Sequence, residues 1–271
     1  MQIKPVLRAV RASPIGPYVN IPRRAFRSIP LASQPLVRMV KWLFTSREDT
    51  NFTYSLTDLN QHYLAHFIAL ATHVDIEVVE TYFSELLNEA QLRDHILGHV
   101  ARYRSTADMR VDFGRRLGWY ALARIVKPAL IVETGVDKGL GSVVLCAALL
   151  KNGHGRFVGT DINPAAGRFL DGPYAEVGKV AYGDSIETLA TLDQIGLFIN
   201  DSDHSSAYEA AEYRAIAPLL APGALVVSDN AHVTDELALW SRQHGRRFLF
   251  WREEPKGHWH PGGGLGISIP S

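Results

Sequence analysis

The spacing of apolar residues changes near Pro128, and the change divides the chain into a helical part and a mixed part. Upstream, apolar positions recur every three or four residues, as on one face of a helix. The stretches with this pattern are 55–73, 75–103 (one or two helices) and 108–126. The last of them stops at Lys127-Pro128, because a proline disfavours helix in the residue before it. We expect residues 48–126 to form a helical region that caps the site or joins subunits.

The first of these helices has a sequence signal for its start. Ser55 is followed three residues later by Asp58, an arrangement that can cap the first turn. The apolar residues spaced three or four apart along the stretch are Leu59, Tyr63, Phe67 and Leu70. The pattern predicts an amphipathic helix that begins near Ser55.

Downstream of Pro128, short apolar runs alternate with helical stretches. The runs are ALIVET, RFVGTD, KVAYGD, GLFIND, GALVVSDN and RFLFWR. Such alternation predicts an α/β fold with a parallel sheet and right-handed crossovers. Several of the predicted strands end in an acid, namely Glu133, Asp161, Asp184, Asp201 and Asp229. Ligands bind at the carboxyl ends of the strands in open α/β sheets, so we expect these acids to converge on one crevice.

The composition is that of a soluble globular protein, with 46% hydrophobic and 21% charged residues. No apolar run approaches the roughly 18 residues that a membrane span needs, and no secretory signal is visible. Cys146 lies among small and apolar residues, so a buried structural thiol is a better interpretation than a nucleophile. We expect the protein to be cytoplasmic.

Charge is distributed unevenly along the chain. Residues 1–47 contain nine Lys or Arg and no Asp or Glu, which leaves the remainder acidic. This basic N-terminal arm could contact nucleic acid, an acidic membrane surface, or the acidic body of its own or a neighbouring subunit. Its composition also resembles that of an organelle transit peptide. The prolines between Pro14 and Pro35 are expected to break any long amphipathic helix, so we favour a partly ordered extension packed on its own protein.

The turn after the first predicted strand is rich in glycine. VETGVDKGLGS places Gly135, Gly139 and Gly141 where a ligand can approach the backbone at the start of a helix. The spacing differs from the G-x-G-x-x-G of NAD and FAD sites and from the P-loop of ATP-binding proteins, so both ligands are disfavoured. Asp161 ends the next strand, at a position where an acid can bind ribose hydroxyls.

Five segments, in this order and spacing, resemble those of class I S-adenosylmethionine-dependent methyltransferases. They are IVETGVDKGLGS, FVGTD, YGDS, FINDSDHS and LLAPGALVVSDNAH. The resemblance covers about residues 125–271 and is closest to the small-molecule O-methyltransferase branch, in which D-x-D-H-S follows the fourth strand. It implies a Rossmann-like fold over residues 127–271, with a mostly parallel seven-stranded sheet and helices on both faces.

The resemblance also implies which residues bind S-adenosylmethionine. Glu133 and Gly135 would line its methionine and ribose portions. Asp161 would bind the ribose hydroxyls, and Asp184 with Ser185 would flank the adenine. The further contacts expected from these segments are Gly139, Gly141, Ser142 and Asp201. Judged without the resemblance, Asp184 could equally be the cap of the next helix.

Methyl transfer to a hydroxyl needs an aligned acceptor whose proton is removed or weakened. Asp201 and the pair Asp229-Asn230 end neighbouring strands of the predicted sheet, and their oxygens are ligands that suit Mg²⁺. Such a metal would lower the pKa of the acceptor. Metal-dependent catechol and sugar O-methyltransferases carry a similar set. No second motif in the chain independently demands a metal.

His204 is the candidate general base, because its ordinary pKa near ~6.5 suits proton transfer at neutral pH. Asp203 or Asp201 could orient it, and we assign Asp203 to the catalytic set as its support. Alternatively, His204 and Ser205 could cap the following helix. The base and the metal are compatible, since a metal can hold the hydroxyl while the histidine takes its proton.

The other histidines divide into three groups. His232 follows Asp229 by three residues and could face the same crevice. His258 and His260 flank Trp259, which could line the acceptor pocket, but two histidines without further ligands do not predict zinc. The histidines with helical spacing, expected on the surface or in packing, are His62, His66, His73, His95 and His99.

Methyl transfer to an oxygen of a small molecule is the leading hypothesis, with a natural-product phenol, a sugar hydroxyl or a carboxylate as acceptor, in a homo-oligomer. An RNA methyltransferase is an alternative that would use the basic arm, but N-P-P-Y-type motifs and a catalytic cysteine pair are absent. A non-catalytic module that binds the cofactor or scaffolds a partner is a third hypothesis. It predicts that His204→Ala and Asp229→Ala leave function untouched.

Overall fold

The computed structural model describes residues 8, 10, 12–48, 53–102 and 107–271. The chain divides into two compact units. The first comprises Met1–Ser46 together with Gly257–Pro261, and the second comprises Arg47–Lys256 together with Gly262–Ser271. In the described part of the chain, every helix is too short or too polar to span a bilayer.

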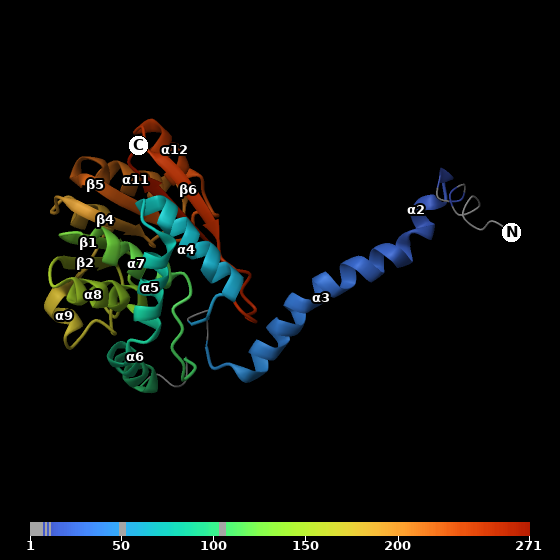
Figure 1. The fold of residues 1–271 in the computed structure, drawn as a ribbon, viewed down its shortest axis with the longest axis horizontal. Helices are drawn as coiled ribbons and strands as arrows, with labels where there is room; N and C mark the ends of the chain where they lie inside the picture. The colour runs from blue at the N-terminus through green and yellow to red at the C-terminus, as the bar shows by residue number, and fades with distance from the viewer. Residues whose placement is uncertain (1–7, 9, 11, 49–52, 103–106) are drawn as a thin grey trace. The chain divides into compact units, whose positions relative to one another are not determined.

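The first unit is built on the helix α3 (Ile21–Thr45), which follows the short helix α2 (Gly16–Val19) (Figure 1). The helix α3 continues through Pro30 and Pro35, so the expectation that the prolines break any long helix was wrong. Each proline removes one backbone donor and crowds one carbonyl, whereas the hydrogen bonds of the neighbouring turns remain. Apolar and basic side chains therefore share one continuous helix.

The second unit is organised around a seven-stranded sheet in the order β3-β2-β1-β4-β5-β7-β6. The strands are β1 (Leu130–Thr134), β2 (Arg156–Asp161), β3 (Gly178–Tyr182), β4 (Ile195–Asn200), β5 (Leu220–Ser228), β6 (Arg247–Arg252) and β7 (Gly264–Ile269). The strands from β3 to β5 pair in parallel, while β7 is antiparallel to both β5 and β6. This sheet confirms the predicted α/β, Rossmann-like fold.

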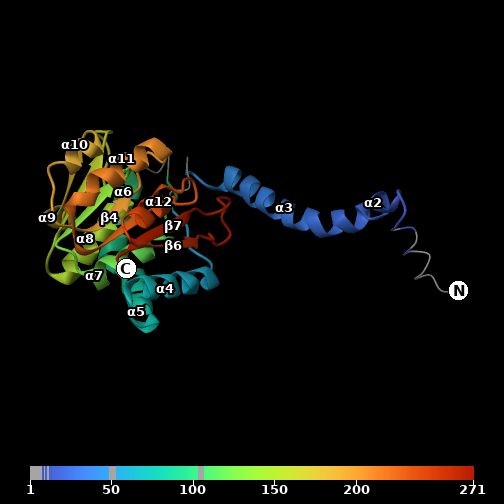
Figure 2. The same ribbon diagram turned by 90° about the horizontal axis from the view of Figure 1, so that it is seen from above.

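Helices cover both faces of the sheet (Figure 2). Alternate residues of a strand point to opposite faces, so Ile131 packs in one core cluster and Val132 in the other. The helices on the first face are α4 (Asp58–Thr72), α5 (Ile76–Leu87), α6 (Ala90–Arg102), α7 (Arg116–Val126) and α8 (Leu140–Asn152). Those on the second are α10 (Ser185–Leu189), α11 (Ser206–Ile216) and α12 (Glu236–Gln243). The short helices α9 (Tyr174–Val177) and η1 (Ala217–Leu219) complete the unit.

The helical region that precedes the sheet consists of α4, α5, α6 and α7, as expected, but two of its starts differ from the prediction. The helix α4 begins at Asp58 after Thr57, whose side chain accepts a hydrogen bond from the backbone nitrogen of Asn60 at 3.2 Å. Ser55, the predicted cap, instead donates to Asp112 at 2.6 Å. The stretch 108–126 becomes helical only at Arg116.

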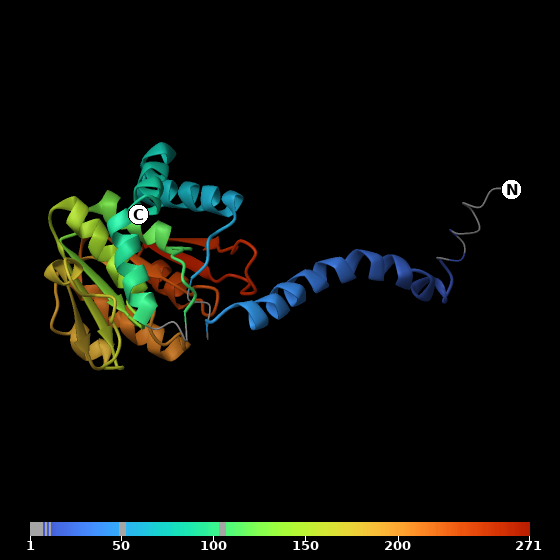
Figure 3. The same cartoon turned by 90° about the horizontal axis from the view of Figure 1, so that it is seen from below.

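The buried face of α4 also differs from the apolar row that its sequence suggested. Leu59, Tyr63 and Leu70 are 57%, 53% and 60% exposed, and of that row only Phe67 is buried. The helix α4 lies beside α5 (Figure 3) and packs against α5 and α7. Its buried residues include Leu64, Ala65, Ile68 and Ala71. Small residues on this face allow a close approach to α7, where Gly118 lies against Leu64 and Ile68.

Candidate active site

A cavity of about 600 Å³ opens at the carboxyl ends of the parallel strands. Most of the residues predicted to bind the cofactor line it, namely Glu133, Gly135, Gly141, Asp161, Asp184, Ser185 and Asp201. Arg115 and Arg116, from the start of α7, border the same space. The convergence follows from the fold, because parallel strands deliver their carboxyl ends to one edge of the sheet.

The glycine-rich turn between β1 and α8 forms one wall of the cavity. Gly135 has a φ of +83°, and a side chain there would overlap the backbone carbonyl of Asp201. Gly139 is the N-cap of α8 with a φ of +92°. A Cβ atom at Gly141 would overlap the Trp119 ring and lie 2.5 Å from Glu133 Oε1. The glycines are therefore required by close approach of the backbone as well as by the turn.

Two predicted cofactor residues also shape the backbone around them. Asp161 accepts hydrogen bonds from the backbone nitrogens of Val136 and Asp137 at 3.0 and 2.9 Å, and so ties the end of β2 to the glycine-rich turn. Asp184 accepts from the nitrogen of Ile186 at 2.8 Å and caps α10. Capping and cavity lining are thus combined in the same carboxylates.

Ser142 lies behind the cavity wall. Its hydroxyl donates to Glu133 Oε2 at 2.5 Å, and both side chains are buried. Burial raises the pKa of Glu133 well above its usual range, and the nearby charge of Asp201 adds to the effect. Ser142 therefore does not line the cavity itself but holds Glu133, which does.

Beneath the site, Glu212 of α11 accepts hydrogen bonds from four residues. Its carboxylate accepts from Ser202 at 2.9 Å, from Thr134 at 3.2 Å, and from Ser185 and Asn200 at shorter distances. Sequence reasoning missed Glu212, because a single acid within a helical stretch carries no motif.

Asp201 and Asp229 lie side by side at the ends of β4 and β5, and their carboxyl groups hydrogen-bond. Burial raises the pKa of Asp201 to about 7, with the charge of Asp229 as the next cause. Burial also acts against ionisation of Asp229, but Arg115 outweighs it and lowers the pKa of that carboxyl. The pair therefore shares a site in which one acid ionises readily and the other does not.

Arg115 is the centre of a buried polar network that sequence reasoning missed. Its guanidinium donates to both carboxylate oxygens of Asp229 and to the hydroxyl of Tyr54. Tyr54 in turn donates to Glu253 Oε1 at 2.6 Å, and Gly263 donates its backbone N–H to Glu253 Oε2 at 2.8 Å. The doublet Arg115-Arg116 before an apolar helix was the available signal, but nothing in its spacing points to Asp229.

His204 borders Asp201 and is held by two further residues. Its Nδ1 lies 2.9 Å from Glu209 Oε1, and its Nε2 lies 2.9 Å from Asn230 Nδ2 and 3.7 Å from Asp201 Oδ1. Burial opposes the charged imidazolium, but the neighbouring carboxyl groups of Asp201 and Glu209 outweigh it and raise the pKa of His204 to about 10. Because Nδ1 faces a carboxylate, it carries a hydrogen, and Nε2 is the nitrogen that exchanges a proton.

Asp203 does not contact His204 in this arrangement. Its two carboxylate oxygens accept from the backbone nitrogen and the hydroxyl of Ser205 at 3.0 and 3.1 Å. The expected support of His204 by Asp203 is therefore wrong, and Glu209 takes that position. The cause is local, since Asp203 exposes its carboxylate just before α11, whereas Glu209 points back from the first turn of that helix.

Negative charge exceeds positive charge in this network. The acids are Asp201, Glu209, Asp229 and Glu253, and the cations bonded to them are Arg115 and His204. The side-chain amide of Asn230 lies beside this group, with Nδ2 2.9 Å from His204 Nε2. The donor set of Asp201, Asp229 and Asn230 therefore fits a divalent cation in charge and in ligand type, although Arg115 shares Asp229.

The other aromatic and histidine residues of the prediction lie in different surroundings. Burial and the charge of Arg252 lower the pKa of His232, which lies against Gly263 and Gly264. In the first unit, Trp259 packs on Trp42 with ring centroids 4.8 Å apart. Cys146 is buried, as expected, and burial raises the pKa of its thiol well above the usual range.

Residues 132–231 match the family model of a methyltransferase domain. Many solved structures share the fold, and three of them serve as examples. A methyltransferase from Geobacter sulfurreducens is 23% identical, with a TM-score of 0.51 over 73% of this chain and 97% of the other. The O-methyltransferase TomG from Streptomyces achromogenes, in complex with S-adenosylmethionine, is 19% identical, with a TM-score of 0.52 over 71% and 96%. An O-methyltransferase from Bacillus cereus is 15% identical, with a TM-score of 0.52 over 71% and 97%.

Among curated proteins, none matches the chain. The sheet order, the glycine-rich turn tied to Asp161 and the matched domain agree with one another. Residues 132–231 therefore match a methyltransferase domain, and the chain shares its fold with solved methyltransferases.

Proposed function

We propose that this methyltransferase transfers the methyl group of S-adenosylmethionine to an oxygen of a small molecule, such as a natural-product phenol, a sugar hydroxyl or a carboxylate. The observation that carries the proposal is the cluster of Asp201, Asp229, Asn230 and His204 beside the cofactor cavity. A cluster of oxygen ligands with an adjoining imidazole suits an acceptor that must be oriented and deprotonated. TomG and the protein from Bacillus cereus, both named O-methyltransferases, support the same acceptor atom.

We assign the cofactor to the 600 Å³ cavity. Asp161 would bind the ribose hydroxyls, Asp184 and Ser185 would flank the adenine, and Glu133 with Gly135 would line the methionine portion. The close packing at Gly135 and Gly141 keeps the wall free of side chains. Gly139 starts α8, and Ser142 holds Glu133 in position.

His204 acts as the general base through Nε2. Glu209 is a positioning residue, because its carboxylate fixes Nδ1 and so directs Nε2 toward Asn230 and Asp201. A base with a pKa of about 10 holds its proton at neutral pH. Positive charge must therefore enter the cluster and lower this pKa, so that His204 loses its proton and can accept the proton of the acceptor hydroxyl. The sulfonium charge of the cofactor is one such source.

Asp201, Asp229 and Asn230 would hold a magnesium ion. When bound, the ion would polarise the acceptor oxygen and offset the acids that raise the pKa of His204. Asp201 then remains ionised at neutral pH, and Arg115 keeps Asp229 oriented.

The test is a methyl-transfer assay that detects S-adenosylhomocysteine with a panel of phenols, sugars and carboxylic acids. His204→Gln is expected to lower kcat by about 10²–10⁴-fold, and Glu209→Gln to lower it less and shift the pH profile. His154→Gln is the control, because His154 is exposed just after the end of α8 and does not line the cavity, and this variant should remain near the wild-type rate. A His204→Gln enzyme with unchanged kcat would exclude the histidine as base.

Chelation tests the metal separately. Activity should be lost in EDTA and recovered with Mg²⁺, while binding of S-adenosylhomocysteine persists in EDTA. Full activity after exhaustive chelation contradicts the magnesium assignment but leaves the base untouched. Methylation of RNA in place of small molecules, or cofactor binding without turnover of any acceptor, would contradict the proposal as a whole.

We also propose that the enzyme forms a homo-oligomer through α4. Leu59, Tyr63 and Leu70 are each more than half exposed and follow one another along the outer side of this helix. A row of large apolar side chains is a common feature of subunit interfaces. Light scattering should give a mass above that of one chain, and Leu59→Glu with Leu70→Glu should reduce it to that of the monomer.

A further inference from the structure

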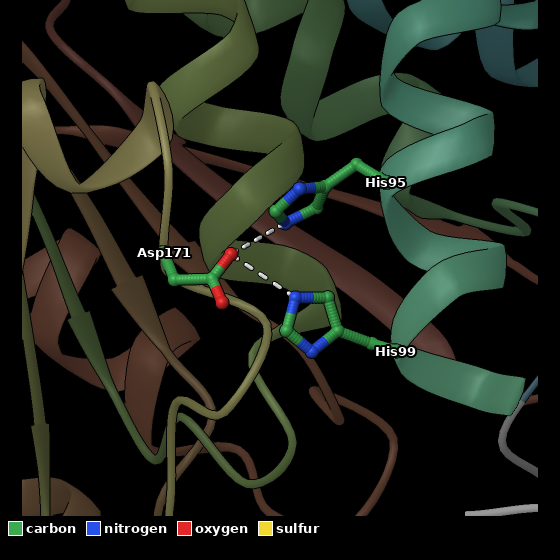
Figure 4. Close-up of side chains that lie close together, drawn as sticks. All are labelled: His95, His99 and Asp171. Atoms are coloured by element: carbon green, nitrogen blue, oxygen red, sulfur yellow. Dashed lines mark hydrogen bonds and ion pairs between the residues drawn. The ribbon is translucent and has the colours of Figure 1, made fainter. Parts of the chain in front are cut away.

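Two histidines of α6 and one aspartate point at one another outside the methyltransferase site (Figure 4). His95 and His99 are one helical turn apart, and Asp171 comes from the segment that joins β2 to α9. The Nε2 atoms of His95 and His99 lie 3.5 and 3.0 Å from the same oxygen, Asp171 Oδ1. All three potential ligand atoms lie within 4.8 Å of one another.

We propose that His95, His99 and Asp171 bind a divalent transition-metal ion of the zinc type. Nitrogen ligands from imidazole with one carboxylate oxygen are a set that zinc accepts. Ligand atoms about 2.0–2.1 Å from a tetrahedral zinc ion lie about 3.3–3.4 Å from one another. The two nitrogen–oxygen separations of 3.0 and 3.5 Å bracket that value.

The hydrogen bonds of the cluster show where the ion would lie. His99 Nε2 lies 3.0 Å from Asp171 Oδ1, and His95 Nε2 lies 3.5 Å from the same oxygen and 2.7 Å from the backbone oxygen of Phe169, so both nitrogens face the space beside Asp171. An imidazole binds zinc through an Nε2 without hydrogen, so the hydrogen of a neutral ring would move to Nδ1, whereas a protonated ring would release one proton to solvent. The backbone oxygen of Phe169, 2.7 Å from His95 Nε2, is close enough to serve as a fourth ligand, and a water molecule is the alternative.

Burial favours a preformed site with an entry path. The side chains of His95 and His99 are 14% and 6% exposed, whereas that of Asp171 is 55% exposed. The ring of Tyr174 packs edge-on against His95 with centroids 4.7 Å apart, and the ring of Phe169 lies beside His99. The imidazoles are therefore held in place, while the ion enters from the side of the carboxylate.

The position of the cluster links it to the cofactor wall. In the segment that carries Asp171, Gly167 donates its backbone N–H to Asp137 at 2.7 Å, and Phe169 donates to Lys138 at 3.1 Å. Asp137 and Lys138 belong to the glycine-rich turn that lines the cavity. A metal at the cluster would fasten α6 to this segment, and through it stabilise the turn. Its role is structural, and it does not depend on the acceptor.

The chain offers a matched control. His62 and His66 on α4 are also one turn apart, with Nε2 atoms 3.2 Å from each other. Glu80 contacts Nδ1 of His62, and among the residues that the structure describes no third ligand meets the two Nε2 atoms there. This pair has the same helical spacing without the carboxylate that completes the proposed site.

The experiment titrates full-length, tag-free protein, first treated with chelator, with zinc chloride by calorimetry in excess Mg²⁺. Magnesium occupies oxygen-ligand sites without competing for imidazole nitrogens. The wild type should bind one zinc ion, and zinc should raise its Tm. Asp171→Asn and His95→Gln should each weaken binding more than about tenfold and abolish the rise in Tm. His62→Gln with His66→Gln should leave both effects intact.

Cobalt provides an independent readout. Co²⁺ bound by the wild type should show the strong visible absorption of tetrahedral coordination, and the Asp171→Asn protein should not. Because Asp171 is half exposed, this variant is expected to remain folded, which circular dichroism verifies. Zinc binding that is equal in wild type and Asp171→Asn, or that is lost in the His62/His66 control, would overturn the proposal.

Discussion

Arg115 brings a positive charge into the interior, where it meets Asp229, Glu253 and the hydroxyl of Tyr54. Burial alone would lower the pKa of the guanidinium, but the charge of Asp229 outweighs burial and raises it. Since the ion pairs are buried, their loss costs more than that of a surface pair. The residue therefore joins the start of α7 to the ends of β5 and β6.

Replacement of Arg115 by Met should destabilise the protein by about 3–5 kcal/mol, because two buried carboxylates lose their counter-ion. The measurement is the free energy of unfolding in urea. Tyr54→Phe is the control, and it removes one hydroxyl from the same network at a cost of about 1 kcal/mol. A loss of less than 1 kcal/mol for Arg115→Met would show that the acids rearrange or become protonated cheaply.

His204 makes the stability of the free enzyme depend on pH. Its folded-state pKa of about 10 lies above the ordinary value of 6.5, so the folded protein holds this proton more tightly than the unfolded chain. The stabilisation is complete below pH 6.5 and is lost as the pH rises toward about 10. Thermal unfolding of the metal-free and cofactor-free protein should show this decline, on the order of 1–3 kcal/mol. In His204→Gln the decline over the same window should be smaller.

The turn between β1 and α8 restricts which residues can occupy it. Gly135 combines a left-handed φ with backbone contact to Asp201, whereas Gly153, at the end of α8, has a φ of +70° and nothing within 4 Å of an added Cβ. The two glycines share the conformation but differ in the space around them. Alanine substitutions at these two glycines therefore separate the cost of backbone strain from the cost of steric overlap.

Gly135→Ala should lower the free energy of unfolding by about 3 kcal/mol and weaken binding of S-adenosylhomocysteine, because the new methyl group displaces the Asp201 backbone. Gly153→Ala should cost only about 1 kcal/mol and leave binding unchanged, since it meets strain alone. Calorimetric titration and chemical denaturation measure both quantities. Equal effects at the two positions would mean that the turn relaxes around the alanine.

The helix α4 shows where reasoning about a single element reaches its limit. Its existence follows from apolar periodicity, but which face is buried depends on its partners. Leu64 and Ile68 face the core against Gly118 of α7, whereas Tyr63 and Leu70 are left exposed. A sequence pattern ranks residues by hydrophobicity and has no knowledge of the surface that each will meet.

On the scale of the whole molecule, the two units should differ in their importance for stability. No side chain of α3 is buried, whereas the sheet of the second unit lies between two core clusters. Deletion of residues 1–45 should therefore change the Tm of the main unfolding transition by less than about 3 °C, a shift worth under 1 kcal/mol in a chain of this size. Binding of S-adenosylhomocysteine should persist. A large fall in Tm would indicate that the helix stabilises the fold.

The sheet and the acids at its strand ends could be predicted from the sequence, because alternation fixes the strands and parallel topology brings their ends together. The hydrogen-bonded network around Arg115 could not be predicted in this way. Tyr54, Arg115 and Glu253 are separated by 61 to 199 positions, and only tertiary packing makes them neighbours. Glu209 holds His204 in place of the predicted Asp203 for a similar reason, since the direction of each carboxylate depends on the turn that starts α11. Motifs locate a site, while its electrostatics come from residues outside them.

The position of β7 implies an order in which the parts of the sheet can form during synthesis. This strand follows all others in the sequence, yet it lies inside the sheet, between β5 and β6. During synthesis, β6 cannot pair with its neighbour β7 until residues 264–269 have left the ribosome. Until then, Glu253, just after β6, is not held next to Arg115. The cofactor wall, formed by earlier strands, can assemble first. The newborn chain should thus acquire a place for its methyl donor before it acquires a finished reaction centre.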